Sequence, residues 1–198
     1  MVSLRPVITP FWLALSLVTG LYLLFIVALL VATATYSTPG DLYQALASRE
    51  IRHAVFLSLT TCSVTALLSL LIAVPAGYLL ARARFPFKTV VESALDIPIV
   101  LPPMVIGLCL LIFFQTGIGH AIDEQITFTY TVFGVVLAQL VIGAAFAIRT
   151  MRGTFGQLSS RPEDVAMTLG CSRGRAFFLV TLPAAWKGMI AAMSVAWA

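Results

Sequence analysis

The stretch RPEDVAMTLGCSRGRAFFLVTLP, Arg161 to Pro183, lies between two runs of residues that are apolar enough to enter a membrane. It is charged and interrupted by glycines, although the chain of 198 residues is 60% hydrophobic and only 10% charged. Soluble domains carry about 25% charged residues, and the mean hydropathy of this chain is +1.02. The composition therefore predicts an all-α, polytopic membrane protein from which this stretch projects into water.

The beginning of the stretch has the pattern of a helix N-terminus. Ser160 and Glu163 have the spacing of a capping box, and Pro162 suits the first turn of a helix. Glu163 and Asp164 also place negative charge at the positive end of the helix dipole. A short helix is therefore predicted to begin at about Pro162.

The middle of the stretch predicts the end of that helix. Val165, Ala166 and Leu169 give it a small apolar face. Gly170 follows directly, and glycine readily adopts the left-handed conformation that ends many helices. We therefore expect a turn at Gly170.

The end of the stretch predicts a second helix. Ser172 is a suitable N-cap for the segment RGRAFFLVT, which is predicted to end before Pro183. The loop that contains both helices, 149–187, is far longer than a connection between two spans requires. A loop that only connects is the alternative, but a folded pair of helices favours docking into a groove of a soluble partner.

Four segments are long and apolar enough to cross about 30 Å of hydrocarbon. They are 11–33, 54–81, 94–114 and 129–148, and a partial fifth covers 188–198. We expect one transmembrane helix and an external loop in residues 1–53, with a turn and a short surface helix at 38–51. Residues 54–198 are expected to form a transmembrane domain that is cut within its fifth helix. An Ala-Thr-Ala cleavage-like site follows the first segment, but its apolar run is longer than that of a signal peptide, which favours an uncleaved anchor.

The basic residues are distributed unevenly between the two sides of the predicted membrane. With the N-terminus in the cytoplasm, ten of the twelve Lys and Arg residues lie on the cytoplasmic side, and only Arg49 and Arg52 lie outside. The positive-inside rule counts these residues alone, so it predicts a cytoplasmic N-terminus and a cytoplasmic loop at 149–187. The net charge of +4 then reflects membrane topology and not nucleic-acid binding.

The second to fourth spans contain neutral polar side chains and no charged residue well inside them. The absence of such charges argues against a proton-driven carrier or pump. Thr61 and Gln139 are the polar residues of most interest. Such groups bond to their own or a neighbouring helix, or they line an aqueous path, and the sequence leaves both possibilities open.

The third span begins with DIPIVLPPMVIG, which contains Pro98, Pro102 and Pro103. Each proline removes a backbone donor and disfavours helix in the residue before it. A straight helix cannot run through this segment. The break is predicted to be either a packing kink or part of a permeation path, because freed carbonyls in lipid need protein or cavity water.

Enzyme motifs are missing from the sequence. It has no G-x-x-x-x-G-K-[ST] loop, no G-x-S-x-G and no H-E-x-x-H, so no catalytic residue is predicted. Its three cysteines form no C-x-x-C pair and no set of metal ligands is apparent. A membrane-embedded enzyme or assembly factor is the rival class, and His53, Asp123 and Glu124 are its poor candidates.

The spacing within the opening stretch resembles the cytoplasmic E-A-A signature of the membrane subunits of binding-protein-dependent ABC importers. That signature runs E-A-A, three residues, Gly, nine residues, Ile, one residue and Leu-Pro. The matching positions here are Asp164, Val165, Ala166, Gly170, Val180, Leu182 and Pro183. Asp, Val and Val replace the Glu, the first Ala and the Ile of the signature. The resemblance implies that these residues, with the adjacent Glu163, couple the chain to an ATPase.

Two further segments, VPAGYLLAR and FPFKTVVESALDIPIVLPPMVIGL, are similar to the molybdate branch of these permeases, which lies close to the tungstate and sulfate/thiosulfate permeases. The resemblance implies a type I importer-like core in the bacterial inner membrane, with a second permease copy in a homodimer or heterodimer. It also implies a periplasmic substrate-binding protein and ATPase subunits that bind ATP and Mg, while this chain holds no cofactor. The family commonly has six spans.

The function expected from this resemblance is ATP-driven import of an oxyanion. Molybdate is the first expectation, and tungstate or sulfate/thiosulfate comes next. The alternative within the transporter class is another solute, such as phosphate, iron or an amino acid. The path through the membrane is expected to involve Thr61, Gln139 and the three prolines of the third span.

Overall fold

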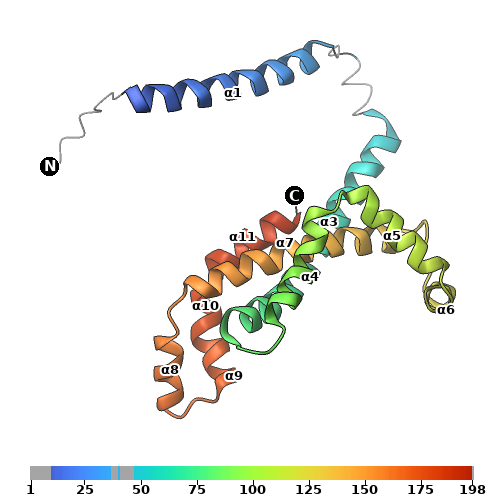
Figure 1. Ribbon diagram of the computed structural model, residues 1–198. Coiled ribbons are helices and arrows are strands. Elements are labelled where there is room, and N and C mark those ends of the chain that lie inside the picture. Colours follow the sequence, from blue (N-terminus) through green and yellow to red (C-terminus); the bar gives the residue numbers. More distant parts are fainter. Residues whose placement is uncertain (1–9, 37–39, 41–46, 198) are drawn as a thin grey trace. The chain divides into compact units, whose positions relative to one another are not determined.

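The computed structural model describes residues 10–36, 40 and 47–197, and every regular element within them is a helix (Figure 1). The predicted all-α fold is confirmed for these residues. Backbone contacts divide the chain into two units, Met1–Val55 and Phe56–Ala198. Most of the surface helix predicted at 38–51 lies outside the described residues, and its end from Arg49 belongs to the next helix.

The helix α1, Pro10–Tyr36, belongs to the first unit and has 27 residues, so it is about 40 Å long. Its mean hydropathy of 2.6 makes it a candidate membrane span. Four hydroxyl groups donate to carbonyls three or four residues earlier in the same helix, those of Ser16, Thr19, Thr33 and Thr35. The helix therefore satisfies these polar groups internally, as a hydrocarbon environment requires.

The core of the second unit is formed by α3, Arg49–Arg82, α7, Val132–Gln157, and α11, Trp186–Trp197. A Cβ added at Gly77 of α3 would lie 2.7 Å from the Cβ of Met151 on α7. Glycine and alanine at such positions let two helix backbones approach closely. The buried cluster consists of Ala73, Leu80, Ala147, Ile148, Met151, Phe155, Ala185 and Ala192.

The helix α7 extends nine residues beyond the predicted end of its span at position 148. The prediction treated residues 149–157 as part of the cytoplasmic loop because they are polar. They remain helical because Met151 and Phe155 are fully buried in the core of the unit. Hydropathy marks where the lipid ends, whereas side-chain packing decides where the helix ends.

The third predicted span, 94–114, consists of two helices, α4, Lys88–Val100, and α5, Pro103–Gln115, which meet at an angle of 109°. The predicted break is present, but Pro98 does not cause it, because Pro98 lies inside α4. The break comes at Leu101 and Pro102, whose ψ angles of 136° and 139° are extended. Each of these two residues precedes a proline, which disfavours the helical conformation.

Shorter helices complete the second unit. They are α6, Gly117–Gln125, α8, Arg161–Thr168, α9, Arg173–Ala176, the π turn η1, Phe177–Thr181, and α10, Leu182–Ala184. Figure 1 shows α8 and α9 beyond the end of α7. In the described residues, three helices are long and apolar enough to cross a membrane, or up to five if each bent pair is one span.

Candidate functional site

The start of α8 lies where the sequence predicts it, but the predicted capping box is wrong. Ser160 has helical angles, φ −77° and ψ −15°, and its side chain caps no backbone N–H. Its carbonyl oxygen instead accepts from the N–H of Asp164 at 3.0 Å. The Glu163 carboxylate does not reach back to the N-terminus of the helix, because it points into the protein.

Glu163 is the buried residue of α8, with 5% of its surface exposed. One carboxylate oxygen accepts a hydrogen bond from the Tyr78 hydroxyl on α3, and the other accepts from the Thr181 hydroxyl on η1 at 3.1 Å. Burying a carboxylate is costly unless hydrogen bonds compensate it. Glu163 therefore anchors α8 to two other elements at once.

Aromatic packing fixes the position of Tyr78. Its ring lies edge-on to Phe155 of α7 at 5.6 Å and tilted against Phe177 of η1 at 4.6 Å between ring centres. Phe155 is fully buried. The Tyr78 hydroxyl, which donates to Glu163, is thus held in place by an aromatic cluster that joins α3, α7 and η1.

The residues of α8 and its C-cap, Leu169, that face away from Glu163 are exposed. Asp164 is exposed, 56% of Val165 is exposed, and 81% of Leu169 is exposed, whereas Ala166 is half-buried. The apolar face predicted from the sequence is therefore largely an outer surface and not part of the core. Exposed apolar side chains beside a carboxylate are suited to docking on another protein.

Gly170 ends α8 as predicted. Its φ angle is +89°, its N–H donates to Met167 O at 3.0 Å, and the N–H of Cys171 donates to Ala166 O at 3.1 Å. This pair of bonds is the Schellman motif, which requires a left-handed residue at its centre. Nothing lies within 4 Å of the position of an added Cβ, so the backbone angle alone makes glycine necessary.

Replacing Gly170 by Val is expected to cost about 1–2 kcal/mol, because a β-branched residue is strained at positive φ. Gly170→Asn is expected to cost less, since Asn tolerates this conformation. The melting temperature and ATP-driven uptake of the full-length protein with its ATPase measure the effect. Equal losses in the two variants would show that the turn does not depend on the backbone angle.

The second helix of the stretch continues further than predicted. Ser172 caps it by accepting from the N–H of Arg175 at 3.5 Å, as expected. The helix does not end before Pro183, because the π turn η1 leads directly into α10, which contains Pro183. The proline lies in the first turn of α10, where a missing N–H is tolerated. The chain then bends by 72° into α11.

The remaining motif residues lie on this second arm of the loop. Val180 and Leu182 are half-buried, and Pro183 is exposed. Together with α8 they form one folded unit, because Thr181 between them donates to Glu163. The structure thus brings the predicted coupling residues together, and it adds Tyr78 and Thr181, which the sequence pattern did not identify.

The two polar path candidates have different environments. Gln139 of α7 accepts from the Thr65 hydroxyl of α3 at 3.1 Å and donates to Cys62 Sγ at 3.7 Å. Thr61 is buried and donates to the Ser58 carbonyl of its own helix at 3.1 Å. Thr61 thus bonds to its own helix and Gln139 to a neighbouring helix, which is one of the two roles that the sequence left open. Thr65 and Cys62, the partners of Gln139, were not among the predicted residues.

The structure does not bring all five path candidates together. Gln139 lines a cavity of ≈ 220 Å³ with Cys62 and Thr65, and neither Thr61 nor any of the three prolines lines it. The prolines belong to the bend between α4 and α5. Of the five candidates, only Gln139 lines this cavity.

Comparison with known proteins identifies the family. Residues 73–198 match the family described as "Binding-protein-dependent transport system inner membrane component". The chain belongs to this family. The match begins within α3 and includes Tyr78, the whole loop 149–187 that was predicted to couple to an ATPase, and α11, while α1 lies outside it.

Similar proteins of this inner membrane component family come from archaea and bacteria. The chain is 35% identical over 182 residues to the molybdate/tungstate transport system permease protein WtpB of Thermococcus kodakarensis, covering 90% of this chain and 70% of that protein. It is 36% identical over 150 residues to the molybdenum transport system permease protein ModB of Escherichia coli K12, covering 74% and 66%. For WtpB of Pyrococcus abyssi, 39% identical over 141 residues, the match covers 71% of this chain and only 53% of that protein.

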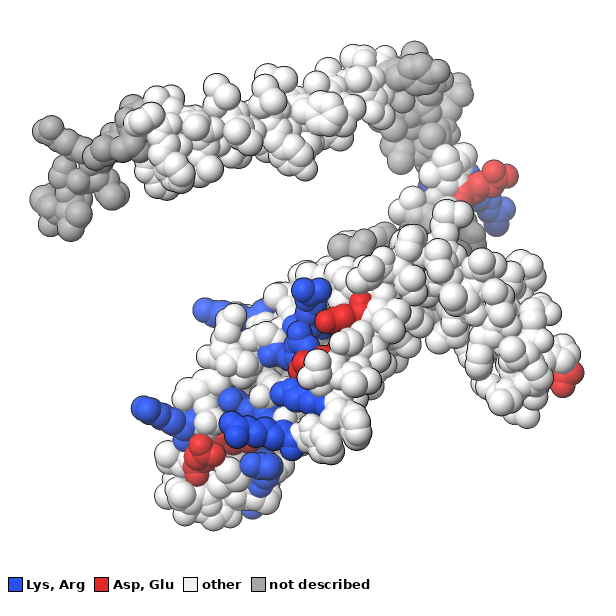
Figure 2. Space-filling view, in the orientation of Figure 1, with Lys and Arg blue, Asp and Glu red and all other residues white. Residues whose placement is uncertain are grey.

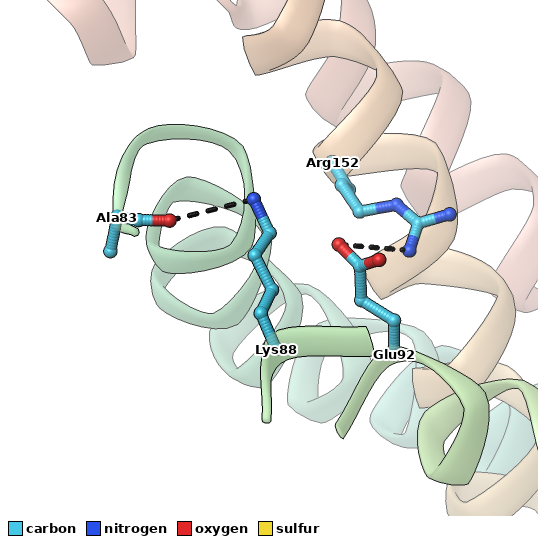
Figure 3. A network of polar contacts seen from close by, with 4 residues as sticks. All are labelled: Ala83, Lys88, Glu92 and Arg152. Atoms are coloured by element: carbon cyan, nitrogen blue, oxygen red, sulfur yellow. Dashed lines mark hydrogen bonds and ion pairs between the residues drawn. The ribbon is translucent and has the colours of Figure 1, made fainter. Parts of the chain in front are cut away.

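A polar network stabilises the turn between α3 and α4 in this inner membrane component (Figure 3). Lys88 donates to the carbonyl of Ala83 at 3.4 Å, and Glu92 pairs with Arg152 of α7 at 3.5 Å. Both side chains of the ion pair are about one-quarter to one-third exposed, so solvent screens the pair only in part. The network fixes the start of α4 against α7.

Asp123 of α6 stabilises the connection between α6 and α7 by accepting backbone hydrogen bonds. Its carboxylate accepts from the N–H of Thr129 at 3.0 Å and of Phe128 at 2.6 Å. These backbone donors stabilise the charged form, so they hold the pKa of Asp123 below its ordinary value. Asp123 therefore has a structural role in the connection between α6 and α7.

Because the pKa of Asp123 is lowered by folding, its stabilising effect is present above the unfolded pKa of about 3.9 and is lost as pH falls through the folded pKa. We expect carboxyl NMR of the full-length protein to give Asp123 a titration midpoint below the ordinary value of an aspartate. Asp123→Asn should speed amide exchange at Phe128 and Thr129. An ordinary midpoint for Asp123 would contradict the assigned hydrogen bonds.

Proposed function

We propose that the chain is the membrane subunit of an ATP-driven importer that carries a tetrahedral oxyanion, molybdate or tungstate, delivered by a periplasmic binding protein. The names of its relatives support this substrate class. The sequence has no nucleotide-binding loop, so ATP and Mg would bind to partner ATPase subunits and this chain would hold no cofactor. A second permease copy would complete the path, in a homodimer or a heterodimer.

The proposed orientation follows from the distribution of charge. Figure 2 shows Lys and Arg side chains gathered at the end of the second unit that carries α8 and α9. The positive-inside rule favours this end as the cytoplasmic one. The protein would then be a multi-pass protein of the bacterial inner membrane with its N-terminus in the cytoplasm, and the coupling loop would face the ATPase.

The observation that carries the proposal is that α8, with its C-cap, has two different faces, one exposed and one bonded to the rest of the protein. Asp164, Val165 and Leu169 form an exposed outer face, which suits a groove of the ATPase. Glu163 on the inner face is bonded to α3 and η1. Closure of the ATPase on ATP would move α8, and the Glu163 bonds would transmit this movement to the membrane helices.

The spans contain neutral polar groups, such as Gln139 and Thr65, and no charge well inside them. A dianion would therefore find no strong binding site at the midplane of the membrane. Weak binding lets the anion leave the path after it has entered. Affinity and selectivity would reside mainly in the binding protein.

The test is reconstitution of the full-length protein in vesicles with its ATPase and binding protein. We expect ATP-dependent accumulation of labelled molybdate, with competition by tungstate and weaker competition by sulfate. An ATPase variant without hydrolytic activity is the control. Uptake of phosphate, iron or an amino acid in place of molybdate would refute the substrate, and catalytic turnover by the isolated chain would favour the rival enzyme class.

A further inference from the structure

A polar cavity of ≈ 330 Å³ lies where the end of α3, the turn after it, α8 and α9 meet. Its lining includes four cationic side chains, those of Arg82, Arg84, Lys88 and Arg173, and two carboxylates, those of Glu163 and Asp164. Figure 2 shows this concentration of positive charge at the same end of the unit. The cavity shares Asp164 with the exposed face of α8, which is the proposed docking surface, but Val165 and Leu169 of that face do not line it.

The two carboxylates do not neutralise the four cations. Both oxygens of Glu163 accept from the hydroxyls of Tyr78 and Thr181. The ion pairs within the described residues are His120 with Glu124 and Arg152 with Glu92, so none of them involves a cation of the cavity. With four cations against two carboxylates, the lining carries a net positive charge.

The protein holds two of these cations with neutral groups. An Nη2 of Arg82 donates to the Leu158 carbonyl at 2.9 Å, and the Nε of Arg82 is buried with no partner in the described residues. Lys88 donates to the Ala83 carbonyl at 3.4 Å. Carbonyl oxygens fix the direction of these side chains but carry no charge, and the two carboxylates of the lining offset the four cations only in part. A partly desolvated charge without a counter-ion is costly.

The helix dipoles compensate only part of this charge. Arg82 lies in the last turn of α3, where a cation is favoured. Arg173 is the first residue of α9, at the end of a helix dipole that disfavours a cation. Arg84 lies in the turn after α3 and is exposed. An external anion would offset the positive charge that the lining retains.

We propose that this cavity binds a tetrahedral oxyanion. Guanidinium groups offer paired donors that match phosphate-type oxygens, and a lysine adds a point charge. Two ligands carry such a group, a free oxyanion in solution and an anionic lipid, whose headgroup contains a phosphate. Basic pockets at the ends of membrane helices bind such headgroups. The site goes beyond the proposed transport function, because it does not depend on which solute crosses the membrane.

The test uses the full-length permease with its ATPase, purified in neutral detergent. The probes are inorganic phosphate and molybdate, measured by equilibrium dialysis. The variant is Arg84→Gln with Arg173→Gln, and the matched control is Arg149→Gln, an exposed cation of α7 outside the cavity. Loss of two charge-assisted contacts is expected to raise the Kd about tenfold or more, whereas the control should leave it within about twofold.

A second measurement distinguishes the lipid source. The same proteins are placed in bilayer discs of phosphatidylcholine with and without phosphatidylglycerol, and the bound lipid is counted by native mass spectrometry. Retention of phosphatidylglycerol by the wild type and the control, but not by the double variant, would support a headgroup in the cavity. If the double variant and the control bind free anions and lipid equally, the site does not exist. Arg84→Gln alone removes one exposed side chain, and its melting curve shows whether the fold is intact.

Discussion

Replacing Glu163 by Ala is expected to abolish ATP-driven uptake and to lower the free energy of unfolding by about 2–4 kcal/mol. The substitution leaves the hydroxyls of Tyr78 and Thr181 without their acceptor inside the protein. A buried, unpaired hydroxyl costs about 1–3 kcal/mol, and this applies most fully to Thr181, which is buried, whereas Tyr78 is half-buried. The melting temperature of the full-length permease and the uptake of its reconstituted complex measure the two effects.

Three further variants separate anchoring from docking. Glu163→Gln keeps an acceptor oxygen for one hydroxyl and should retain part of the stability and uptake. Tyr78→Phe removes one donor and should be intermediate. Asp164→Asn changes an exposed group of the same helix, so it should leave stability within about 0.5 kcal/mol and weaken ATPase binding. If Glu163→Ala behaves like Asp164→Asn, then Glu163 is a docking residue and does not anchor α8.

The role of Glu163 shows the limit of local sequence patterns. The spacing of Ser160 and Glu163 predicted a capping box, and the start of α8 at Arg161 agrees with that pattern. The carboxylate nevertheless bonds Tyr78, which is 85 residues away in the sequence. The sequence offered two indications for Tyr78, its place near the end of a span, which is typical of an interfacial aromatic residue, and its place in the family-like segment VPAGYLLAR, and neither indicated a bond to Glu163.

Local patterns succeeded where the backbone itself decides the outcome. Gly170 was expected to be left-handed, and it is, because few other residues tolerate that angle. The break of the third span was expected from its prolines, but only the adjacent Pro102 and Pro103 produce it. Pro98 stays within α4, because one missing donor can be tolerated inside a helix that neighbouring contacts support.

Long-range packing decided the features that hydropathy could not predict. The extension of α7 to Gln157 depends on the burial of Met151 and Phe155 against other helices. The bond between Thr65 and Gln139 joins two spans that are 74 residues apart. Both facts require knowledge of which helices are neighbours, and composition and periodicity do not contain it.

Replacing Gly77 by Val is expected to destabilise the protein strongly, because Gly77 lies at the close contact between α3 and α7. A Cβ at this position would lie 2.7 Å from Met151 Cβ and 2.9 Å from the backbone nitrogen of Arg152. A backbone atom cannot move aside cheaply, so Gly77→Val should force α3 away from α7 at a cost of about 3 kcal/mol. Tyr78 is the next residue, so the displacement should also disturb its bond to Glu163.

The matched control is Gly153→Val on α7, where nothing lies within 4 Å of an added Cβ. Both variants place the same side chain in a helix, so their intrinsic helix propensities change alike. We expect Gly77→Val to lower the melting temperature and to remove coupled uptake, and Gly153→Val to leave the stability of the full-length permease nearly unchanged. Equal stability of the two variants would mean that α3 and α7 do not approach closely at Gly77. The anchor of α8 would then lack the rigid support on which transmission from the coupling loop to the membrane helices depends.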